Sequence, residues 1–337
     1  MIYHVQFPAL GIELDVNRVA FTIGGMSIYW YGIMIALGLG LALCFGFLKA
    51  KSFGIDSDRF VDVVMVGTVI SVACARAFYV AMAPFEYESV WDMINMRDGG
   101  IAIYGAVIGA FGSAYFLAKW RRLKLLPLCD LVSVCFLIGQ GIGRWGNFFN
   151  QEAFGTNTNL PWGMYSEGTN EFLKLAIVTA PNGVSIDPTA PVHPTFLYES
   201  IWCLLGFLLL WAYMKHRKFD GEIFLMYIVW YGLERCVVEG LRTDSLMIGG
   251  VRVSQMIAVL SVVVGLALLI YLRRKNKDKA LVVHYTFAGK GVPEGAEMSW
   301  LLGETPPTDA QLKKQREIAI NLKKQLDSGA KPVGVWN

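Results

Sequence analysis

Residues 26–48 read MSIYWYGIMIALGLGLALCFGFL, a run that contains no charged side chain. A helix of about 20 mostly apolar residues is long enough to cross the hydrocarbon core of a bilayer. The chain as a whole is apolar, because 55% of its 337 residues are hydrophobic and 17% are charged. Soluble domains carry about 25% charged residues. The sequence therefore predicts an all-α polytopic membrane protein.

Six further apolar runs follow the first, so we expect about seven transmembrane helices. The predicted spans are residues 26–48, 60–83, 101–118, 127–149, 195–214, 222–241 and 252–272. Residues 150–192 are too polar to span and too long for a tight turn, which predicts a small head. The chain divides into a membrane domain, residues 1–275, and a basic tail, residues 276–337. Within the tail, residues 308–326 have the spacing of an amphipathic helix.

Lys and Arg are concentrated in alternate loops, and loops of this kind face the cytosol. The basic residues that follow spans 1, 3, 5 and 7 are Lys49, Lys51, Arg59, Lys119, Arg121, Arg122, Lys124, Lys215, Arg217, Lys218, Arg273, Arg274, Lys275, Lys277 and Lys279. By contrast, residues 150–192 contain a single Lys, and Arg97 is the one basic residue of the 84–100 loop. We therefore expect the N-terminus and the head outside and the C-terminus in the cytosol.

The polar side chains within or beside the predicted spans fall toward their outer ends. They are Tyr31, Arg76, Tyr79, Tyr104, Arg144, Asn147, His193, Tyr231, Arg235, Glu239 and Arg242. A charge inside a bilayer is costly and usually faces a cavity or a partner. The common depth of these residues predicts a polar cavity that opens to the outer leaflet.

Each of these residues also has a structural explanation when taken alone. Arg235 and Glu239 could form an i,i+4 ion pair, and Arg76 could pair with a carboxylate or a backbone carbonyl. Arg242 could snorkel to the outer interface, and His193 could be a capping or loop residue. These explanations weaken together, because several helices place polar groups at one depth.

Residues 141–155 read GIGRWGNFFNQEAFG and form the densest polar stretch. An arginine presents a planar fork of donors that suits phosphate. Arg144, Arg235 and Arg242 together could therefore hold one phosphate monoanion. Glu152 and Glu239 would then orient the arginines and offset their charge.

The six Cys residues form no CxxC pair and lie mostly in apolar runs. They are expected to be buried thiols, so we predict no metal site. The formal net charge of +3 gives no indication of nucleic acid binding.

Residues 143–155 resemble the signature of phosphatidylglycerol–prolipoprotein diacylglyceryl transferases, which reads GRxGNFxNxExxG. Four other segments are similar to the same family and occur in the family's order. They are residues 29–32 (YWYG), 97–100 (RDGG), 193–199 (HPTFLYE) and 235–242 (RCVVEGLR). The resemblance covers about residues 15–275, and a signature of this length has few chance matches.

The resemblance implies a seven-span enzyme of the bacterial cytoplasmic (inner) membrane with its head outside. It implies phosphatidylglycerol as the donor, the lipobox cysteine of an exported prolipoprotein as the acceptor, and release of glycerol 1-phosphate. Membrane lipid and the prolipoprotein signal peptide are the expected partners, and no metal or other cofactor is expected. The family's two essential arginines fall on Arg144, which also takes the role in phosphatidylglycerol binding, and on Arg235.

The resemblance and the residue pattern together give a set of expected site residues. The expected catalytic residues are Arg144, Arg235, Glu152, Asn147, Tyr104 and Glu239. The expected substrate-binding residues are Arg144, Arg242, Tyr31, Gly146, Asn150, Gly155, Arg76 and His193.

Two features depart from the family pattern. Many members have His-Gly-Gly where this chain has Tyr104, Gly105 and Ala106. A tyrosine with an ordinary pKa of about 10 is a poor base at neutral pH, so the histidine's proposed role as base does not carry over unchanged. The second departure is the tail after Lys279, for which the resemblance implies no role.

Three other classes of membrane protein are weaker interpretations. The first alternative is a membrane transporter or a lipid-binding protein for an anionic phospholipid. A transporter would be expected to have its polar residues near the midplane, often with internal repeats. An intramembrane protease would need a nucleophile with a base, paired aspartates or metal ligands, and no GxSxG or HExxH motif is present. A scaffold does not account for three arginines at one depth. The transferase is therefore the leading prediction.

Overall fold

The computed structural model describes residues 2–83, 85, 87–96, 99–179, 187–242, 247–248 and 251–329. The chain divides into two compact units. The first unit comprises Met1–Cys44 and Ser133–Lys277, and the second comprises Phe45–Val132 and Asp278–Asn337. Each unit is described by itself.

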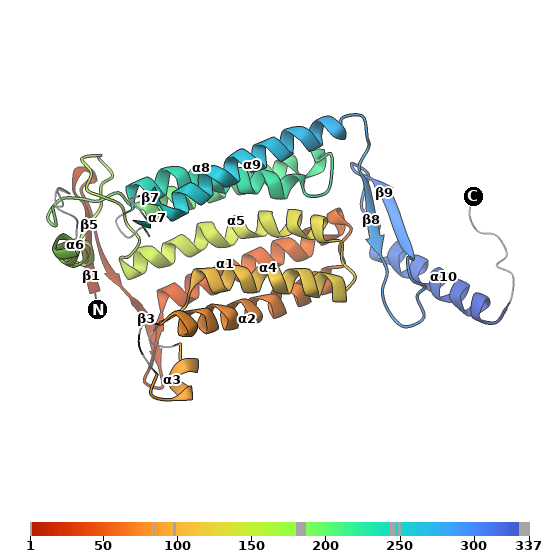
Figure 1. Ribbon diagram of the computed structural model, residues 1–337, viewed down its shortest axis with the longest axis horizontal. Helices are drawn as coiled ribbons and strands as arrows, with labels where there is room; N and C mark the ends of the chain where they lie inside the picture. Colours follow the sequence, from red (N-terminus) through yellow and green to blue (C-terminus); the bar gives the residue numbers. More distant parts are fainter. Residues whose placement is uncertain are drawn as a thin grey trace. The chain divides into compact units, whose positions relative to one another are not determined.

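Long helices lie at all seven predicted spans (Figure 1). They are α1 (Trp30–Lys49), α2 (Ser57–Met82), α4 (Ile103–Trp120), α5 (Leu125–Asn150), α7 (Thr195–Tyr213), α8 (Glu222–Leu241) and α9 (Val253–Lys275). Among the described residues, five of these helices are long and apolar enough to cross a membrane, namely α1, α2, α5, α7 and α9. Helix α4 has 18 residues and is less apolar, and α8 carries four charged side chains. The polytopic class is therefore confirmed, whereas the count of seven spans stays a prediction.

The prediction of an all-α protein is too simple, because short strands before, between and after the long helices form small antiparallel sheets. The shorter elements are β1 (Ile2–Phe7), η1 (Pro8–Leu10), β2 (Ile12–Asn17), β3 (Val19–Ile23), β4 (Met26–Tyr29), η2 (Ala50–Phe53), α3 (Val90–Ile94), β5 (Tyr165–Ser166), α6 (Glu167–Thr179), η3 (Met214–His216), β6 (Met247–Ile248), β7 (Val251–Arg252), β8 (Val282–Thr286), β9 (Glu297–Leu301) and α10 (Asp309–Asp327). Strand β1 pairs with β2 and β5, and the other pairs are β3–β4, β6–β7 and β8–β9.

The first predicted span is corrected at its start by one of these hairpins. Residues 26–29 form β4 and pair with β3, so helix α1 begins at Trp30. Gly24 and Gly25 connect the two strands with φ angles of 56° and 82°. Glycine reaches positive φ at little cost, and two-residue hairpin turns of this kind require it.

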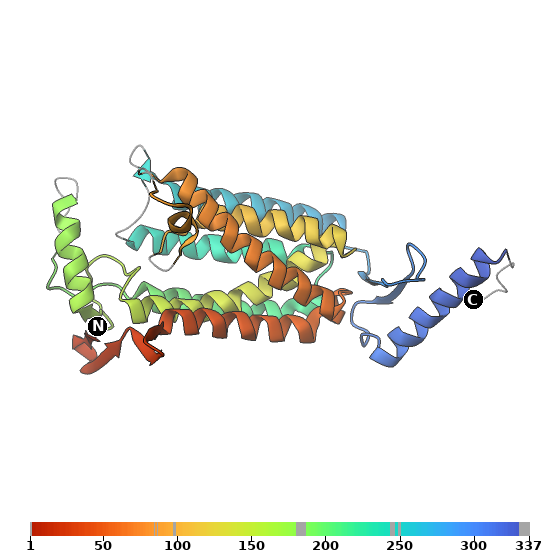
Figure 2. The ribbon, with the colours of Figure 1, turned by 90° about the horizontal axis from the view of Figure 1, so that it is seen from below.

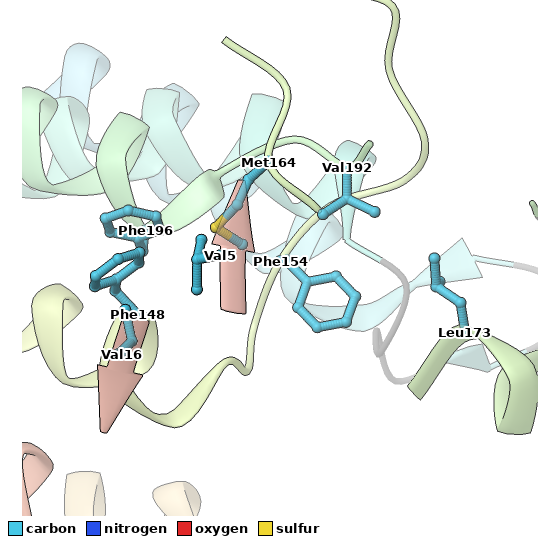
Figure 3. Close-up of a cluster of buried hydrophobic side chains, with 8 residues drawn as sticks. All are labelled: Val5, Val16, Phe148, Phe154, Met164, Leu173, Val192 and Phe196. Carbon is cyan, nitrogen blue, oxygen red and sulfur yellow. The ribbon is translucent and has the colours of Figure 1, made fainter. Parts of the chain in front are cut away.

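The head of the first unit has its own apolar core, which Figure 3 shows. Its buried members are Val5, Val16, Phe148, Phe154, Met164, Leu173, Val192 and Phe196. Val5 and Val16 lie on the N-terminal strands, beside Phe148 and Phe196 from the ends of α5 and α7. The N-terminal strands therefore complete a head that the sequence places in residues 150–192 alone.

Helices α7 and α8 are joined by a reciprocal pair of tryptophans. The rings of Trp202 and Trp230 stack with their centroids 4.2 Å apart. Each indole Nε1 donates a hydrogen bond of 3.0 Å to the backbone carbonyl of the other residue. The two helices are thus held together by polar bonds that need no charge and satisfy both indole donors inside an apolar region.

In the second unit, α2 and α4 pack side by side (Figures 1 and 2). Glycines on α4 allow the close approach. A Cβ atom at Gly105 would lie 2.5 Å from the carbonyl oxygen of Cys74, and one at Gly109 would lie 2.9 Å from the Cα of Ser71. Small residues of this kind let helix backbones approach closely in membrane proteins.

The tail of the second unit folds into a hairpin, β8–β9, and the helix α10. Tyr285, Phe287, Val292 and Leu312 form a small buried core between them. Thr308 begins α10 with a capping box, in which its side chain accepts from the backbone of Gln311. The predicted amphipathic helix at residues 308–326 is therefore confirmed, and the hairpin before it was not predicted.

Gly109→Val is expected to destabilise the protein, because the added side chain must push α2 and α4 apart. Overpacking of a tight contact costs about 1–3 kcal/mol. The matched control is Gly112→Val on the same helix, where nothing lies within 4 Å of the added Cβ. Thermal unfolding in detergent measures both variants. Equal melting temperatures for Gly109→Val and Gly112→Val would contradict the packing described here.

Candidate active site

The candidate site of the first unit is built around one buried carboxylate, Glu199 on α7. Glu199 is 1% exposed. One of its oxygens forms an ion pair with Nε of Arg144 on α5. The other lies 3.5 Å from Nη1 of Arg235 on α8. A single side chain therefore links three helices and holds two arginines.

Arg235 has a second partner one helical turn further along α8. Its Nη2 donates to the carboxylate of Glu239, which is 2% exposed. Glu234 is also buried, at 5% exposed, and interacts electrostatically with Glu199, Arg144 and Arg235. The cluster thus contains more than one carboxylate for each of its two central arginines. The carboxylates offset the positive charge that would otherwise be buried alone.

Arg144 is the arginine of this cluster that is open to a ligand. Its side chain is 22% exposed, and its one ion pair within the described residues uses Nε. Nη1 and Nη2 therefore remain available as hydrogen-bond donors. A guanidinium fixed at one end and open at the other is suited to bind a phosphate oxygen.

The signature stretch continues from α5 into a sharp turn. Gln151 has a φ of 53°, which ends the helix and reverses the chain direction. Asn147 Nδ2 then donates to Glu152 Oε1 at 3.0 Å, across that turn. Asn150 Oδ1 accepts a 3.0 Å hydrogen bond from Nε of Arg18. The signature polar residues are therefore held by one another and by the N-terminal segment.

Tyr31 on α1 covers the glycine of the signature. A Cβ atom at Gly146 would lie 2.8 Å from Cδ2 of the Tyr31 ring, so only glycine accommodates this contact. The Tyr31 hydroxyl interacts electrostatically with Glu152 and Arg144. The structure therefore brings Tyr31 and Gly146 to the same place as Arg144.

Gly155 fixes the C-terminal end of α8 beside the head. Its backbone N–H donates to the carbonyl of His193 at 2.9 Å, and the next residue, Thr156, donates to the carbonyl of Leu241 at 2.7 Å. Gly155 also forms an isolated antiparallel bridge with Arg242. A Cβ at Gly155 would lie 2.8 Å from the Cβ of His193, which excludes larger residues. This contact positions Arg242 next to the signature turn.

His193 contacts a tyrosine rather than the arginine cluster. Its Nδ1 lies 3.2 Å from the hydroxyl of Tyr198, which also accepts a 2.7 Å hydrogen bond from Nε1 of Trp162. Burial lowers the pKa of His193, so its ring is neutral at pH 7. This geometry favours a structural role, and its substrate-binding role stays a prediction.

Arg76 and Tyr104 belong to the second unit. All three guanidinium nitrogens of Arg76 donate to backbone carbonyls, at 2.7–3.0 Å, and the acceptors are Asp92, Met93, Gly99 and Gly100. Arg76 therefore holds the loop before α4. Tyr104 lies in the first turn of α4 and is 43% exposed. The predicted motif residues Arg97 and Asp98 lie outside the described residues.

Two buried carboxylates of the cluster were not predicted as site residues, namely Glu199 and Glu234. Both carried the signal that identified the others, because each is a charged residue within an apolar span. Glu199 also lies in the family-like segment 193–199. The sequence does not show that Glu199 pairs with Arg144 and Arg235, because both arginines are distant from it along the chain.

Apolar helices that can cross a bilayer, together with a buried arginine cluster open at Arg144, define a polytopic membrane protein with a site for an anionic ligand. The sequence model of the prolipoprotein diacylglyceryl transferase family matches residues 18–271. The chain therefore belongs to the prolipoprotein diacylglyceryl transferase family.

Curated relatives agree with this assignment over most of their length. A phosphatidylglycerol–prolipoprotein diacylglyceryl transferase of Clostridioides difficile is 37% identical over 263 residues, which cover 78% of this chain and 98% of the relative. Proteins of the same name from Clostridium novyi and Lysinibacillus sphaericus are each 40% identical, over 78% of this chain and 98% and 95% of the relatives.

Glu199→Gln is expected to destabilise the protein, because it keeps the shape of the side chain and removes the charge that two arginines share. Breaking a buried ion pair by removing one partner costs about 3–5 kcal/mol. The control is Glu152→Gln, since Glu152 is exposed and exposed substitutions change stability by about 0.5 kcal/mol or less. Thermal unfolding in detergent compares the two variants. A Glu199→Gln protein as stable as the control would refute the structural importance of this bridge.

Proposed function

We propose that this chain transfers the diacylglyceryl group of phosphatidylglycerol to the lipobox cysteine thiol of an exported prolipoprotein. Membership of the family and the names of its curated relatives support this function. The observation that carries it at the site is Arg144, held on the buried carboxylate of Glu199 with two nitrogens open to a ligand. The phosphate of the donor lipid is the group that this arrangement suits.

The proposed reaction is a displacement at a glycerol carbon. The cysteine sulfur forms a bond to the carbon that carries the phosphate ester, and the carbon–oxygen bond breaks. Glycerol 1-phosphate leaves, and overall it takes up the proton that the thiol loses. Negative charge grows on the departing phosphate, so fixed cationic donors there lower the barrier. Arg144 and Arg235 take this role.

The remaining residues of the first unit are assigned by their contacts. Glu199 and Glu239 position the arginines through direct ion pairs. Asn147 and Glu152 hold each other across the signature turn, beside the hydroxyl of Tyr31. Gly146 and Gly155 leave room for Tyr31 and His193 to approach. Asn150 and Arg242 are further binding residues. A cysteine pKa falls beside cations, so the same arginines also favour the reactive thiolate.

The proposed topology has seven spans in the bacterial inner membrane, with the N-terminus outside and the tail, residues 276–337, in the cytosol. It rests on the basic residues that follow alternate helices and on the membrane domain of residues 1–275. A green fluorescent protein fused after the tail is expected to fluoresce, and alkaline phosphatase inserted in the head near residue 160 is expected to be active. An active phosphatase fused after the tail would overturn this orientation.

Arg144→Ala is expected to lower transfer by about 10²–10³-fold, because one donor to the developing phosphate charge is lost. The assay uses purified protein, phosphatidylglycerol labelled in its acyl chains, and a lipobox peptide with its Cys intact or changed to Ser. Label is expected on the Cys peptide alone, with glycerol phosphate released. Arg144→Lys keeps the positive charge but removes the pair of Nη donors. Full activity in that variant would contradict the proposal that both Nη atoms bind the phosphate.

Two further results of the same assay separate the alternatives. Tyr104→Phe is expected to retain activity within about tenfold, because Tyr104 is 43% exposed in the first turn of α4 and the change removes one neutral hydroxyl, whose hydrogen bond is worth about 1 kcal/mol. A loss as large as that of Arg144→Ala would make Tyr104 a catalytic residue. No transfer by a folded wild-type protein that binds the lipid would favour the transporter or lipid-binding alternative.

A further inference from the structure

A pocket of about 280 Å³ lies in the second unit, where α2 begins and α4 ends. It is lined by Arg59, Trp120, Arg121, Arg122, Ala288 and Gly289. None of these residues takes part in the proposed transfer reaction. Ala288 and Gly289 belong to the tail, to which the family resemblance assigns no role.

The floor of the pocket contains a buried arginine with few partners. Arg59 is 8% exposed and lies in the first turn of α2. Its Nη1 donates to the carbonyl of Arg121 at 3.0 Å, and this is its one side-chain hydrogen bond within the described residues. Burying a cation without matching acceptors is costly. Asp56 and the Tyr285 hydroxyl attract Arg59 electrostatically, but neither accepts a hydrogen bond from its guanidinium within the described residues. An anionic ligand would supply acceptors for the remaining guanidinium donors.

The other arginines give the pocket an excess of positive charge. Arg121 pairs with Asp62, but its buried Nε has no hydrogen-bond acceptor in the described structure. Arg122 is exposed, has a φ of 55°, and forms no ion pair within the described residues. Of the three arginines that line the pocket, Arg121 is thus the one held by a carboxylate.

The tail brings a fourth arginine, Arg316, next to Gly289 of the pocket lining. Gly289 has a φ of 143°, and a Cβ at this position would overlap the guanidinium of Arg316 on α10. Arg316 and Arg59 are close enough to interact electrostatically. The tail residues that line the pocket are held near α2 by a 2.6 Å hydrogen bond, which the Tyr285 hydroxyl donates to Asp56 at the start of α2.

We propose that this pocket binds a phosphate group, carried either by the headgroup of an anionic phospholipid or by free phosphate. Several planar guanidinium forks around a small cavity match the oxygens of phosphate better than they match a single carboxylate. Trp120 is 72% exposed at the rim, as is common for tryptophans at a membrane interface. The site is separate in sequence and role from the donor-lipid site at Arg144.

The experiment is hydrogen–deuterium exchange of the full chain in phosphatidylcholine nanodiscs. Free phosphate is added in one arm, and phosphatidic acid replaces part of the lipid in the other. Slower exchange is expected at residues 121–124 and 287–291, because a bound anion ties the two walls together. Protection by phosphate alone identifies a soluble ligand, and protection by phosphatidic acid identifies a headgroup. Both results support a phosphate site.

Matched variants and salts separate this site from general charge screening. The double variant Arg122→Gln and Arg316→Gln removes two exposed arginines. It is expected to raise the ligand concentration for half-maximal protection at least tenfold, since each charge-assisted hydrogen bond contributes about a factor of ten to affinity. Arg274→Gln removes an exposed charge from α9 and should bind as the wild type does. Equal protection by sodium chloride or by oleate, no protection in either arm, or full protection in the double variant would overturn the proposal.

Discussion

The candidate site depends on one buried carboxylate, Glu199, which two arginines on different helices share. An ion pair removed from water is stable only if its geometry and hydrogen bonds repay the loss of hydration. A small displacement of α5, α7 or α8 would leave a charge uncompensated, so the bridge constrains the spacing of all three helices. It also fixes Arg144 before any ligand arrives. Preorganised donors of this kind stabilise developing charge without having to rearrange.

Glycines make this arrangement possible by allowing other residues to approach the site. The ring of Tyr31 lies against Gly146, and the Cβ of His193 lies against Gly155. Through Thr156, the head is hydrogen-bonded to the C-terminal end of α8, which also carries Arg235 and Glu239. The head is therefore part of the site's construction. A side chain at Gly146 would displace the ring of Tyr31, and one at Gly155 would displace His193 or the end of α8, even though glycine itself contributes no chemistry.

The sequence predicted the helices well because apolar length is a local property. The seven long helices begin and end within a few residues of the predicted spans. Partners are not local, and there the predictions were incomplete. Val5 on β1 pairs with Ser166 on β5, and no local pattern connects two such distant segments. A backbone carbonyl was one of the two partners predicted for Arg76, but the sequence could not identify which carbonyls accept, because every residue carries one. Hydropathy identifies a polar group that needs a partner and does not identify the partner.

Helix α8 shows why composition alone is a poor guide to the burial of charged residues. Its charged residues lie near its two ends, with an apolar segment between Glu222 and Glu234. At the first end, Glu222 is fully buried and pairs with Arg273 on α9. At the other end, Arg235 pairs with Glu239 and Glu199. Charges that are matched by neighbouring helices cost far less to bury than the same charges on an isolated helix. The ion pairs of α8 thus lower the cost of burying its charged residues among neighbouring helices, and the same pairs assemble the candidate site.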